Sequence, residues 1–274
     1  MKLKLIPSNN NKIYRLIIFN KSFIIKFYIN KKHTNLFYNE IYFYKRFKNL
    51  QNIYIPKKYI SYSNFKIGIF KFYHLKKLIN IKEKEIKFCC KFIYLINKDI
   101  HNYHVNAIEC CLRPIDHIKA PLNKIKKLKK NIIKDSYLYK KVKAIQKEFV
   151  LHYWRLKRIK LNYNLHKPYS KKRFIVSPSD FGFHNIFQSN NDLFFLDFEH
   201  SGLDDIIKLI CDFYFFPAND FDVSLKDYFK KSLINYFSYL DKSQLYYEID
   251  LLLPFYKLKW DIIILNQLIH EQQY

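Results

Sequence analysis

Glycine is scarce in this chain, with three residues among 274, and Asp and Glu together number 23 against 49 Lys and Arg. No run of about 18 apolar residues occurs, which argues against a transmembrane helix. The first eleven residues contain two lysines but no apolar core followed by small residues, so no signal peptide is visible. These absences predict a cytoplasmic protein without a membrane span.

Cysteine is also rare, and its spacing fits neither a metal site nor a disulfide framework. The five cysteines are an odd number, and they include two adjacent pairs, Cys89 with Cys90 and Cys110 with Cys111. They lie among apolar residues and show neither a CxxC motif nor Cys/His metal spacing. The sequence therefore predicts buried free thiols in a reducing compartment.

Aromatic and basic residues are abundant by contrast. Hydrophobic residues make up 49% of the chain and aromatics 19%, which excludes a disordered polypeptide. The net charge of +26 has two explanations. A nucleic-acid partner would use lysines to displace counterions from phosphates, whereas A/T-rich codons would enrich Lys, Ile, Asn, Phe and Tyr regardless of any partner. We favour the compositional bias and expect no obligatory nucleic-acid partner.

The N-terminal part has the patterning of short β-strands. Four runs are rich in β-branched and aromatic residues: residues 12–19, 22–28, 59–62 and 66–73. Residues 20–21 form a turn between the first two runs. Residues 35–47 instead place their apolar side chains at helical spacing. This order predicts an antiparallel sheet that carries one helix.

From about residue 78 the pattern becomes mainly helical. Residues 85–95 and 122–149 are amphipathic, and the second segment carries lysines opposite its apolar stripe. Such a basic face is usually only solvated. Short strands are expected at residues 186–187 and 193–196, and the remainder is expected to be helical. The fold class is therefore α+β.

Two carboxylates and an amide follow one another in a pattern suited to phosphoryl transfer. Asp180 lies five residues before Asn185, and Asp197 ends the strand that comes next. Phosphoryl transfer needs oxygen ligands for a divalent metal and a second carboxylate that orients the acceptor hydroxyl. Taken singly, each residue is equally well explained as a cap of a turn or helix.

Lys26 is the second unusual feature, because it interrupts the apolar strand Phe-Ile-Ile-Lys-Phe-Tyr at residues 23–28. A buried ammonium is costly without a partner. Glu40, fourteen residues later on the expected helix, is a candidate partner, as in kinase folds that pair a strand lysine with a helix glutamate. The alternative is a lysine that reaches water along an edge strand and a surface glutamate.

These residues carry a family resemblance. Residues 177–185 resemble the catalytic loop of the aminoglycoside phosphotransferase and choline kinase superfamily, and residues 196–199 resemble its metal-binding Asp motif. Residues 204–213 look like the segment that usually follows, and the resemblance spans roughly residues 9–268. It implies a bilobal protein-kinase-like fold, with a nucleotide-binding lobe at residues 1–76 and a catalytic and acceptor-binding lobe at residues 77–274.

The resemblance implies a role for each site residue. Asp180 corresponds to the catalytic base, and Asn185 and Asp197 correspond to the ligands of Mg²⁺. ATP would be held by Lys26 and Glu40 at its phosphates, by the loop around Asn10, and by the hinge around Phe72. The roles, in full, are catalytic Asp180; cofactor-binding Lys26, Glu40, Asn10 and Phe72; and metal-binding Asn185 and Asp197.

The sequence departs from the family pattern at three places. Pro178 and Gly182 stand where relatives often have histidine, although His184 is close by. The nucleotide loop has three asparagines and no glycine, although asparagine also tolerates positive φ. Retention of the Asp/Asn/Asp set argues for an active enzyme over the alternative, an inactive kinase-like scaffold that binds RNA or another polyanion.

The acceptor is expected to be a small molecule with a hydroxyl group, such as a sugar, an amino sugar or an amino alcohol. Glu199 and Asp204 follow the metal motif closely and are candidate acceptor contacts. Carboxylates at these positions would suit a cationic or polyhydroxylated acceptor. Capping of a helix explains acidic residues there equally well.

Overall fold

The computed structural model describes residues 1–8, 11–29, 35–132, 136–158, 165–189 and 192–271. The chain forms two compact units, which we describe separately. Unit 1 comprises Met1–Ile108, Val176–Leu203 and Val223–Leu233, and unit 2 comprises Glu109–Ile175, Asp204–Asp222 and Ile234–Tyr274. This division differs from the two predicted lobes, residues 1–76 and 77–274. The boundary between the lobes therefore stays a prediction.

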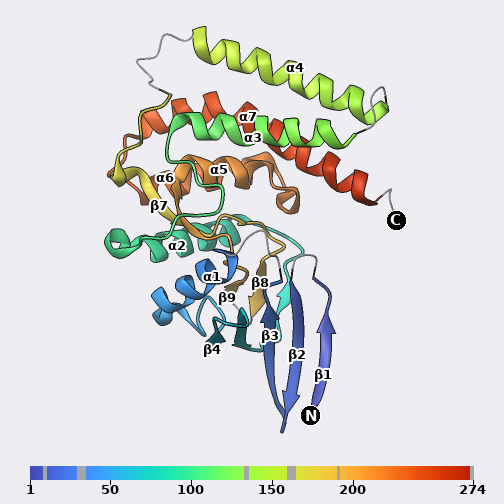
Figure 1. Cartoon of the computed structure of the whole chain (residues 1–274). Helices are drawn as coiled ribbons and strands as arrows, with labels where there is room; N and C mark the ends of the chain where they lie inside the picture. The colour runs from blue at the N-terminus through green and yellow to red at the C-terminus, as the bar shows by residue number, and fades with distance from the viewer. Residues whose placement is uncertain (9–10, 30–34, 133–135, 159–164, 190–191, 272–274) are drawn as a thin grey trace. The chain divides into compact units, whose positions relative to one another are not determined.

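Unit 1 contains a five-stranded antiparallel sheet with the order β1-β2-β3-β5-β4. Its strands are β1 (Lys2–Ile6), β2 (Lys12–Ile18), β3 (Lys21–Phe27), β4 (Lys58–Tyr62) and β5 (Ile67–Lys71). Figure 1 shows β1, β2 and β3 side by side, with helix α1 (Asn35–Arg46) nearby. The predicted sheet with one helix is therefore confirmed.

The sheet differs from the prediction in two details. The turn between β2 and β3 lies at Phe19 and Asn20, which both have positive φ (43° and 63°), one residue earlier than expected. Consecutive positive φ values are typical of the tight hairpin turns that match strand twist. Strand β1 pairs with β2 and was not expected from the sequence.

The rest of unit 1 packs around stacked aromatic rings. Helix α2 (Glu83–Asn97) buries Phe92, whose ring stacks on Phe195 with centroids 4.0 Å apart. Phe195 ends β9 (Asp192–Phe195), which pairs with β8 (Ile186–Ser189), and β8 pairs with the short β6 (Lys76–Lys77). Phe198, just past β9, stacks on Phe43 of α1, also at 4.0 Å. These rings hold the segment that contains the candidate catalytic residues.

Unit 2 is mainly helical. Its helices are α3 (Pro114–Asn131), α4 (Tyr137–Arg158), α5 (Ile206–Phe215) and α7 (Lys242–Glu271). Helix α7 packs against the other three, and Figure 1 shows α3 and α7 running alongside each other. The prediction of one helix across residues 122–149 is wrong, because α3 and α4 are separate helices. Helix α6 (Val223–Tyr236) begins in unit 1 and ends in unit 2, and the strands β7 (Phe174–Ser177) and β10 (Gly202–Asp205) also pass from one unit to the other.

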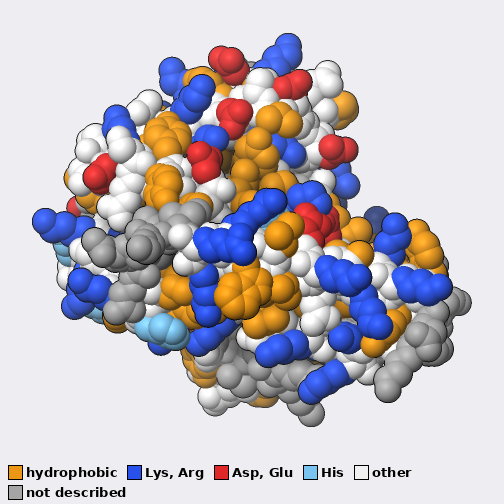
Figure 2. Space-filling view, turned by 90° about the horizontal axis from the view of Figure 1, so that it is seen from above, with side chains coloured by type: hydrophobic (Ala, Val, Ile, Leu, Met, Phe, Trp, Pro, Cys, Tyr) orange, Lys and Arg blue, Asp and Glu red, His pale blue; other side chains and the backbone are white. Residues whose placement is uncertain are grey.

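Basic side chains are spread widely over the surface. On the face that Figure 2 shows, Lys and Arg side chains are scattered among hydrophobic and uncharged ones rather than gathered in one band. The five cysteines are free thiols, and all except the half-buried Cys110 are buried. Within the described part of the chain, no helix is long and apolar enough to cross a membrane.

Candidate active site

The three residues expected at the phosphoryl-transfer centre lie at the ends of neighbouring elements in unit 1. Asp180 lies in the loop between β7 and β8, Asn185 immediately precedes β8, and Asp197 follows β9. Because β8 and β9 pair in antiparallel fashion, the start of one lies beside the end of the other. The backbone N–H of Leu196 accordingly donates to the carbonyl of Asn185 at 2.9 Å.

The loop at residues 177–185, the expected catalytic loop, is held by its own side chains. The amide Nδ2 of Asn185 lies 3.2 Å from the carbonyl oxygen of Asp180 and 3.4 Å from its Oδ2. Nε2 of His184 is also 3.4 Å from that Oδ2. Phe181 anchors the loop, because its buried ring stacks on Phe195. The Asp180 side chain keeps 32% of its surface exposed, so its carboxylate remains accessible.

Lys26 is surrounded by three carboxylates. Its Nζ lies 2.7 Å from Glu40 Oε2, 2.6 Å from Asp197 Oδ1 and 2.9 Å from Glu199 Oε2. The lysine comes from β3 and Glu40 comes from α1, as the sequence predicts for a kinase-like pair. The side chains of Lys26 and Glu40 are almost fully buried, whereas that of Asp197 is 37% exposed. Asp197 is therefore the accessible member of the cluster.

Glu40 is fixed by two further hydrogen bonds. The hydroxyl of Tyr28 donates to its Oε2 at 2.6 Å, and the backbone N–H of Phe198 donates to its Oε1 at 3.2 Å. Both carboxylate oxygens thus have partners, which compensates for the cost of burying this charge. The second bond also ties helix α1 directly to the residue after Asp197.

The charged groups in this cluster shift one another's pKa values. Burial lowers the pKa of Lys26, but Glu40, Asp197 and Glu199 outweigh it and hold that pKa well above its ordinary value. Burial raises the pKa of Asp197, yet the ammonium of Lys26 holds it below its ordinary value. Burial raises the pKa of Glu40 more than the ammonium of Lys26 lowers it, and the charges of Asp197 and Glu199 raise it further. Lys26 is therefore a cation and Asp197 a carboxylate at neutral pH.

A cavity of about 410 Å³ opens beside this cluster, entirely within unit 1. Lys26, Glu40 and Asp197 line it on one side together with Asn185. Apolar and aromatic side chains complete the wall: Ile6, Pro7, Ile13, Ile24, Tyr44, Pro56, Phe70, Phe72, Tyr73, Leu75, Phe187 and Leu196. An apolar pocket with charged groups at one edge suits a ligand that has a flat ring and an anionic tail.

Phe72 was expected at the hinge that contacts adenine, and Asn10 in the loop that contacts the phosphates. Phe72 lines the cavity, and the guanidinium of Arg15 stacks over its ring at 3.8 Å. Its backbone N–H donates to the Ser22 carbonyl at 3.3 Å, so an adenine contact would use another group. Asn10 lies outside the described residues.

Asn11, the neighbour of Asn10, is buried and donates from Nδ2 to Glu199 Oε2 at 2.7 Å. Its Oδ1 is buried and has no hydrogen-bond partner among the described residues. The start of β2 is therefore tied to the segment after Asp197.

The two residues expected to contact an acceptor are both buried. Glu199 is 2% exposed and holds Lys26 and Asn11. Asp204, in unit 2, is 0% exposed; its Oδ2 lies 2.9 Å from Lys208 Nζ, and its Oδ1 accepts from the backbone N–H of Cys111. Both carboxylates are engaged by internal partners, so direct acceptor contact stays a prediction without geometric support.

Three residues have contacts in the site that the sequence does not predict. Tyr28 lies two residues after Lys26, and the period of two along a strand places both side chains on the same face. His184 was noted only as a nearby histidine, whereas it lies against Asp180. The contact of Glu199 with Asn11 was not predicted, because the two residues are 188 positions apart and no local signal reveals their pairing.

The oxygen donors present are compatible with a hard divalent cation. Asn185 and Asp197 both line the cavity, and amide and carboxylate oxygens are the ligands that Mg²⁺ prefers. In addition, carboxylate oxygens of Glu40, Asp197 and Glu199 lie within 4.8 Å of one another. Lys26 is the cation they share in this structure. A metal at Asp197 would therefore sit beside the ammonium, as it does in sites that bind polyphosphates.

No protein-family model matches the chain, and no curated protein matches its sequence. Solved structures do match its fold. A choline kinase from Streptococcus pneumoniae superposes with a TM-score of 0.62 at 16% identity, covering 100% of this chain and 86% of the other. An ethanolamine kinase from Plasmodium vivax gives 0.60 at 16% identity, covering 98% and 77%. A spectinomycin phosphotransferase in complex with ADP and spectinomycin gives 0.58 at 15% identity, covering 90% and 78%.

These matches extend over nearly the whole chain. They confirm the kinase-like fold expected from the catalytic-loop and metal-motif residues. The three structures named above are those of two small-molecule kinases and an antibiotic phosphotransferase. The resemblance inferred from a few short motifs is thus also found at the level of the complete fold.

Proposed function

We propose that this chain, which has the fold of choline kinase, ethanolamine kinase and aminoglycoside phosphotransferase structures, is an ATP-dependent small-molecule kinase. It would transfer the γ-phosphoryl group of ATP to a hydroxyl of its acceptor. The observation that carries this proposal is the buried Lys26, paired with Glu40 at 2.7 Å and Asp197 at 2.6 Å at the edge of an apolar cavity.

Lys26 would bind the α- and β-phosphates of ATP. Its ammonium lines the cavity, and three carboxylates keep it protonated. Glu40 would hold the ammonium in place, because its own position is fixed by Tyr28 and by the backbone of Phe198. The adenine ring would lie among the apolar side chains around Phe70 and Phe72.

Asn185 and Asp197 would hold Mg²⁺. The MgATP complex supplies the phosphoryl group together with the positive charge that neutralises it during transfer. Asp197 is accessible and carries a negative charge at neutral pH, as a metal ligand requires. The hydrogen bond between Asn185 and the catalytic loop would keep the amide oxygen directed away from Asp180.

Asp180 would orient the acceptor hydroxyl and accept its proton at the carboxylate. This carboxylate is partly exposed, and Asn185 and His184 limit its rotation from the side of Oδ2. Orientation of the hydroxyl is the main contribution such a carboxylate makes, because phosphoryl transfer involves little covalent chemistry by the protein.

The acceptor class follows from the proteins that share the fold. Their names give choline, ethanolamine, spectinomycin and amicoumacin as ligands or substrates. We therefore propose a sugar, an amino sugar or an amino alcohol as the acceptor. A cytoplasmic location is also part of the proposal, because the five cysteines are free thiols.

Thermal unfolding with and without MgATP tests this function. Ligand at about one hundred times its dissociation constant should stabilise the fold by about 2.7 kcal/mol. We expect a magnesium-dependent rise in Tm for the wild type that Asp197→Ala loses. Asp192→Ala is the matched control, since Asp192 is exposed on β9 and does not line the cavity. It should retain the full shift.

Absence of any shift at millimolar MgATP, in a folded protein, would contradict the kinase proposal. Steeply salt-dependent binding of RNA together with that absence would favour the inactive basic scaffold instead. A shift that Asp197→Ala and Asp192→Ala retain equally would place nucleotide binding elsewhere in the chain.

A further inference from the structure

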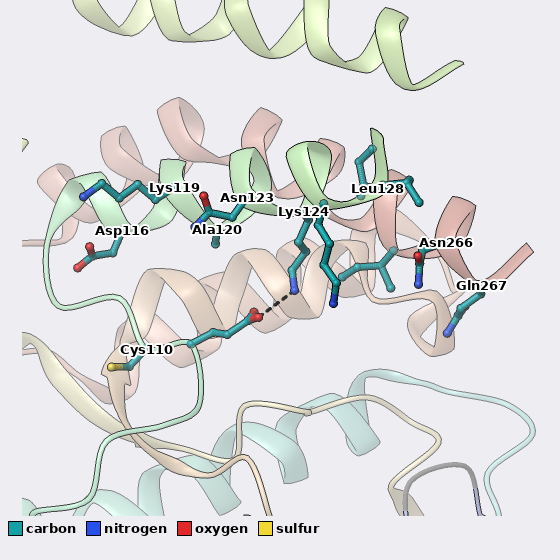
Figure 3. A pocket seen from close by; sticks show the side chains of 13 residues that line it. Cys110, Asp116, Lys119, Ala120, Asn123, Lys124, Leu128, Asn266 and Gln267 are labelled. Carbon is teal, nitrogen blue, oxygen red and sulfur yellow. Dashed lines mark hydrogen bonds and ion pairs between the residues drawn. The ribbon is translucent and has the colours of Figure 1, made fainter. Parts of the chain in front are cut away.

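Unit 2 contains a second cavity, of about 620 Å³, whose lining includes none of the residues assigned to ATP, Mg²⁺ or the acceptor hydroxyl. It lies between helix α3, the C-terminal part of α7 and the segment at Glu109 and Cys110. Figure 3 shows Asp116 and Lys119 at one end of this pocket, and Asn266 and Gln267 of α7 at the other. We call it the α3–α7 pocket.

The charged side chains of the α3–α7 pocket have an excess of positive charge. Three lysines line it, against two carboxylates. One of these carboxylates, Asp116, already has a cationic partner. It accepts two hydrogen bonds from the Arg113 guanidinium and one from the Arg113 backbone N–H. The second, Glu109, forms an ion pair with Lys124 at 3.0 Å, which Figure 3 marks with a dashed line. Within the described residues, Lys119 and Lys127 have no anionic partner.

Neutral hydrogen-bond donors accompany these lysines. The amides of Asn123, Asn266 and Gln267 line the same space and have no partner within the part of the chain that the structure describes. Each amide offers two N–H donors. Leu128 and Ile262 add apolar surface. The pocket thus combines unpaired cations, free donors and an apolar wall.

The pocket already stabilises one carboxylate. Glu109 has a positive φ of 56°, a conformation that is uncommon for a residue other than glycine, and it points its side chain at Lys124. Burial raises the pKa of Glu109, but Lys124, Lys259 and Lys208 outweigh it and hold that pKa below its ordinary value. A carboxylate in this location is therefore held in the field of several lysines.

We propose that the α3–α7 pocket binds a small molecule that carries a carboxylate or phosphate group. The anionic group would contact Lys127, whereas Lys119 at one end of the pocket and Asn266 at the other would contact further polar groups of the ligand. Lys124 is partly neutralised by Glu109, so this ion pair limits the affinity for the anion. This binding does not depend on the proposed phosphoryl transfer.

Calorimetric titration tests the proposal with inorganic phosphate and citrate as the probes and tetramethylammonium as the cationic counter-probe. All titrations are made at one ionic strength of about 0.15 M, because surface charges are screened within about 8 Å there. We expect one saturable site for phosphate or citrate on the wild type and none for tetramethylammonium. The better of the two anions identifies phosphate or carboxylate as the preferred group.

Two double variants separate the pocket from the general basic surface. Lys119→Gln with Lys127→Gln should weaken anion binding about tenfold, since each removes a charge-assisted contact. Lys126→Gln with Lys130→Gln removes the same charge from exposed positions on the same helix that do not line the pocket, and it should leave the affinity within about twofold. Equal weakening by both pairs would overturn the proposal.

A third variant has the opposite expected sign. Glu109→Gln frees Lys124 from its ion pair and should tighten anion binding about threefold. A variant that merely disturbed the fold would not bind more tightly. Unchanged or weaker binding in Glu109→Gln, or the absence of a saturable anion site in the wild type, would contradict the proposed pocket.

Discussion

The Nζ of Lys26 lies 2.6 Å from Oδ1 of Asp197, although the two residues are 171 positions apart in the chain. This contact joins the N-terminal sheet to the segment after β9. The same ammonium holds Glu40 and Glu199. One lysine thus contacts three carboxylates and organises the candidate active site.

Lys26→Met should destabilise the fold by about 3–5 kcal/mol at neutral pH, because it leaves the carboxylates of Glu40 and Glu199 buried without a cation. The loss should shrink as pH falls from 7 to 4, since protonation removes the uncompensated charges. Chemical denaturation across this range measures both effects. Lys21→Met, at the exposed start of β3, is the control and should change little. A small, pH-independent loss in Lys26→Met would show that the ion cluster does not contribute to folding.

Asp180→Asn should separate binding from chemistry. The side chain is not part of the Lys26 cluster, so MgATP should stabilise this variant as it does the wild type. Phosphoryl transfer to an acceptor should fall by about 10²–10⁴-fold, because the amide cannot accept the hydroxyl proton. Coupled detection of ADP with a panel of amino alcohols and amino sugars measures the rate. Transfer at the wild-type rate would remove Asp180 from the catalytic role.

The N-terminal sheet was predictable because its information is local. Alternating β-branched and aromatic residues specify β2 and β3, and the change to a helical period specifies α1. Strand β1 was missed because four of its five residues are exposed, so its sequence Lys-Leu-Lys-Leu-Ile carries little burial signal. The separation of α3 from α4 was missed because the amphipathic pattern continues across residues 122–149 without a glycine or proline break.

The candidate site was predictable only in part, for a related reason. Lys26 violates the apolar pattern around it and is therefore visible in the sequence, whereas Glu40 was found only as its candidate partner by analogy with kinase folds. The burial of Glu199 and Asp204 depends on partners that only the fold brings near, the Asn11 amide and the backbone N–H of Cys111. Acidic residues beside a metal motif look equally suited to a solvent-exposed pocket and to an internal ion pair. The sequence alone does not distinguish these two environments.

Gly202→Ala tests the close approach of the backbone at Gly202 to the backbone of Asn106 and Ala107 in unit 1. A Cβ at Gly202 would overlap the backbone of Asn106 and Ala107, which are fixed by the hydrogen bond from Ala107 N to the Leu203 carbonyl at 3.1 Å. We expect a loss of about 2 kcal/mol or more in unfolding free energy. Gly68→Ala is the comparison, since its Cβ would meet only the side chains of Phe70 and Tyr28. A loss in Gly202→Ala smaller than that in Gly68→Ala would contradict the close approach.

The buried imidazole of His117 links α3 to two other segments of unit 2. Its Nε2 lies 3.0 Å from Asp205 Oδ2, and its Nδ1 lies 2.6 Å from the Tyr256 hydroxyl. Burial lowers the pKa of His117, but the neighbouring Cys111 and the hydrogen bond to Asp205 raise it to about 10. Burial raises the pKa of Asp205, but Arg173 and His117 hold it below its ordinary value.

The raised pKa of His117 and the lowered pKa of Asp205 limit the stability that this pair contributes to one range of pH. A histidine whose pKa is raised by folding contributes stability that is complete below its unfolded pKa of about 6.5. That contribution is lost as pH rises toward about 10, the pKa in the folded state. The depressed pKa of Asp205 contributes stability that is present above its unfolded pKa of about 3.9 and is lost in stronger acid. The pair therefore stabilises unit 2 most between about pH 4 and 6.5.

His117→Gln removes the titrating group and should reveal this window. The difference in unfolding free energy between wild type and His117→Gln should be largest near pH 5–6 and should narrow by more than about 1.4 kcal/mol toward pH 10, the equivalent of a shift of one pKa unit. His104→Gln makes the same change at an exposed histidine and should give a small, constant difference. A constant difference for His117→Gln would mean that the buried imidazole is neutral in the folded protein. Asp205 would then be balanced by Arg173 alone, whose Nε lies 2.8 Å from Oδ1.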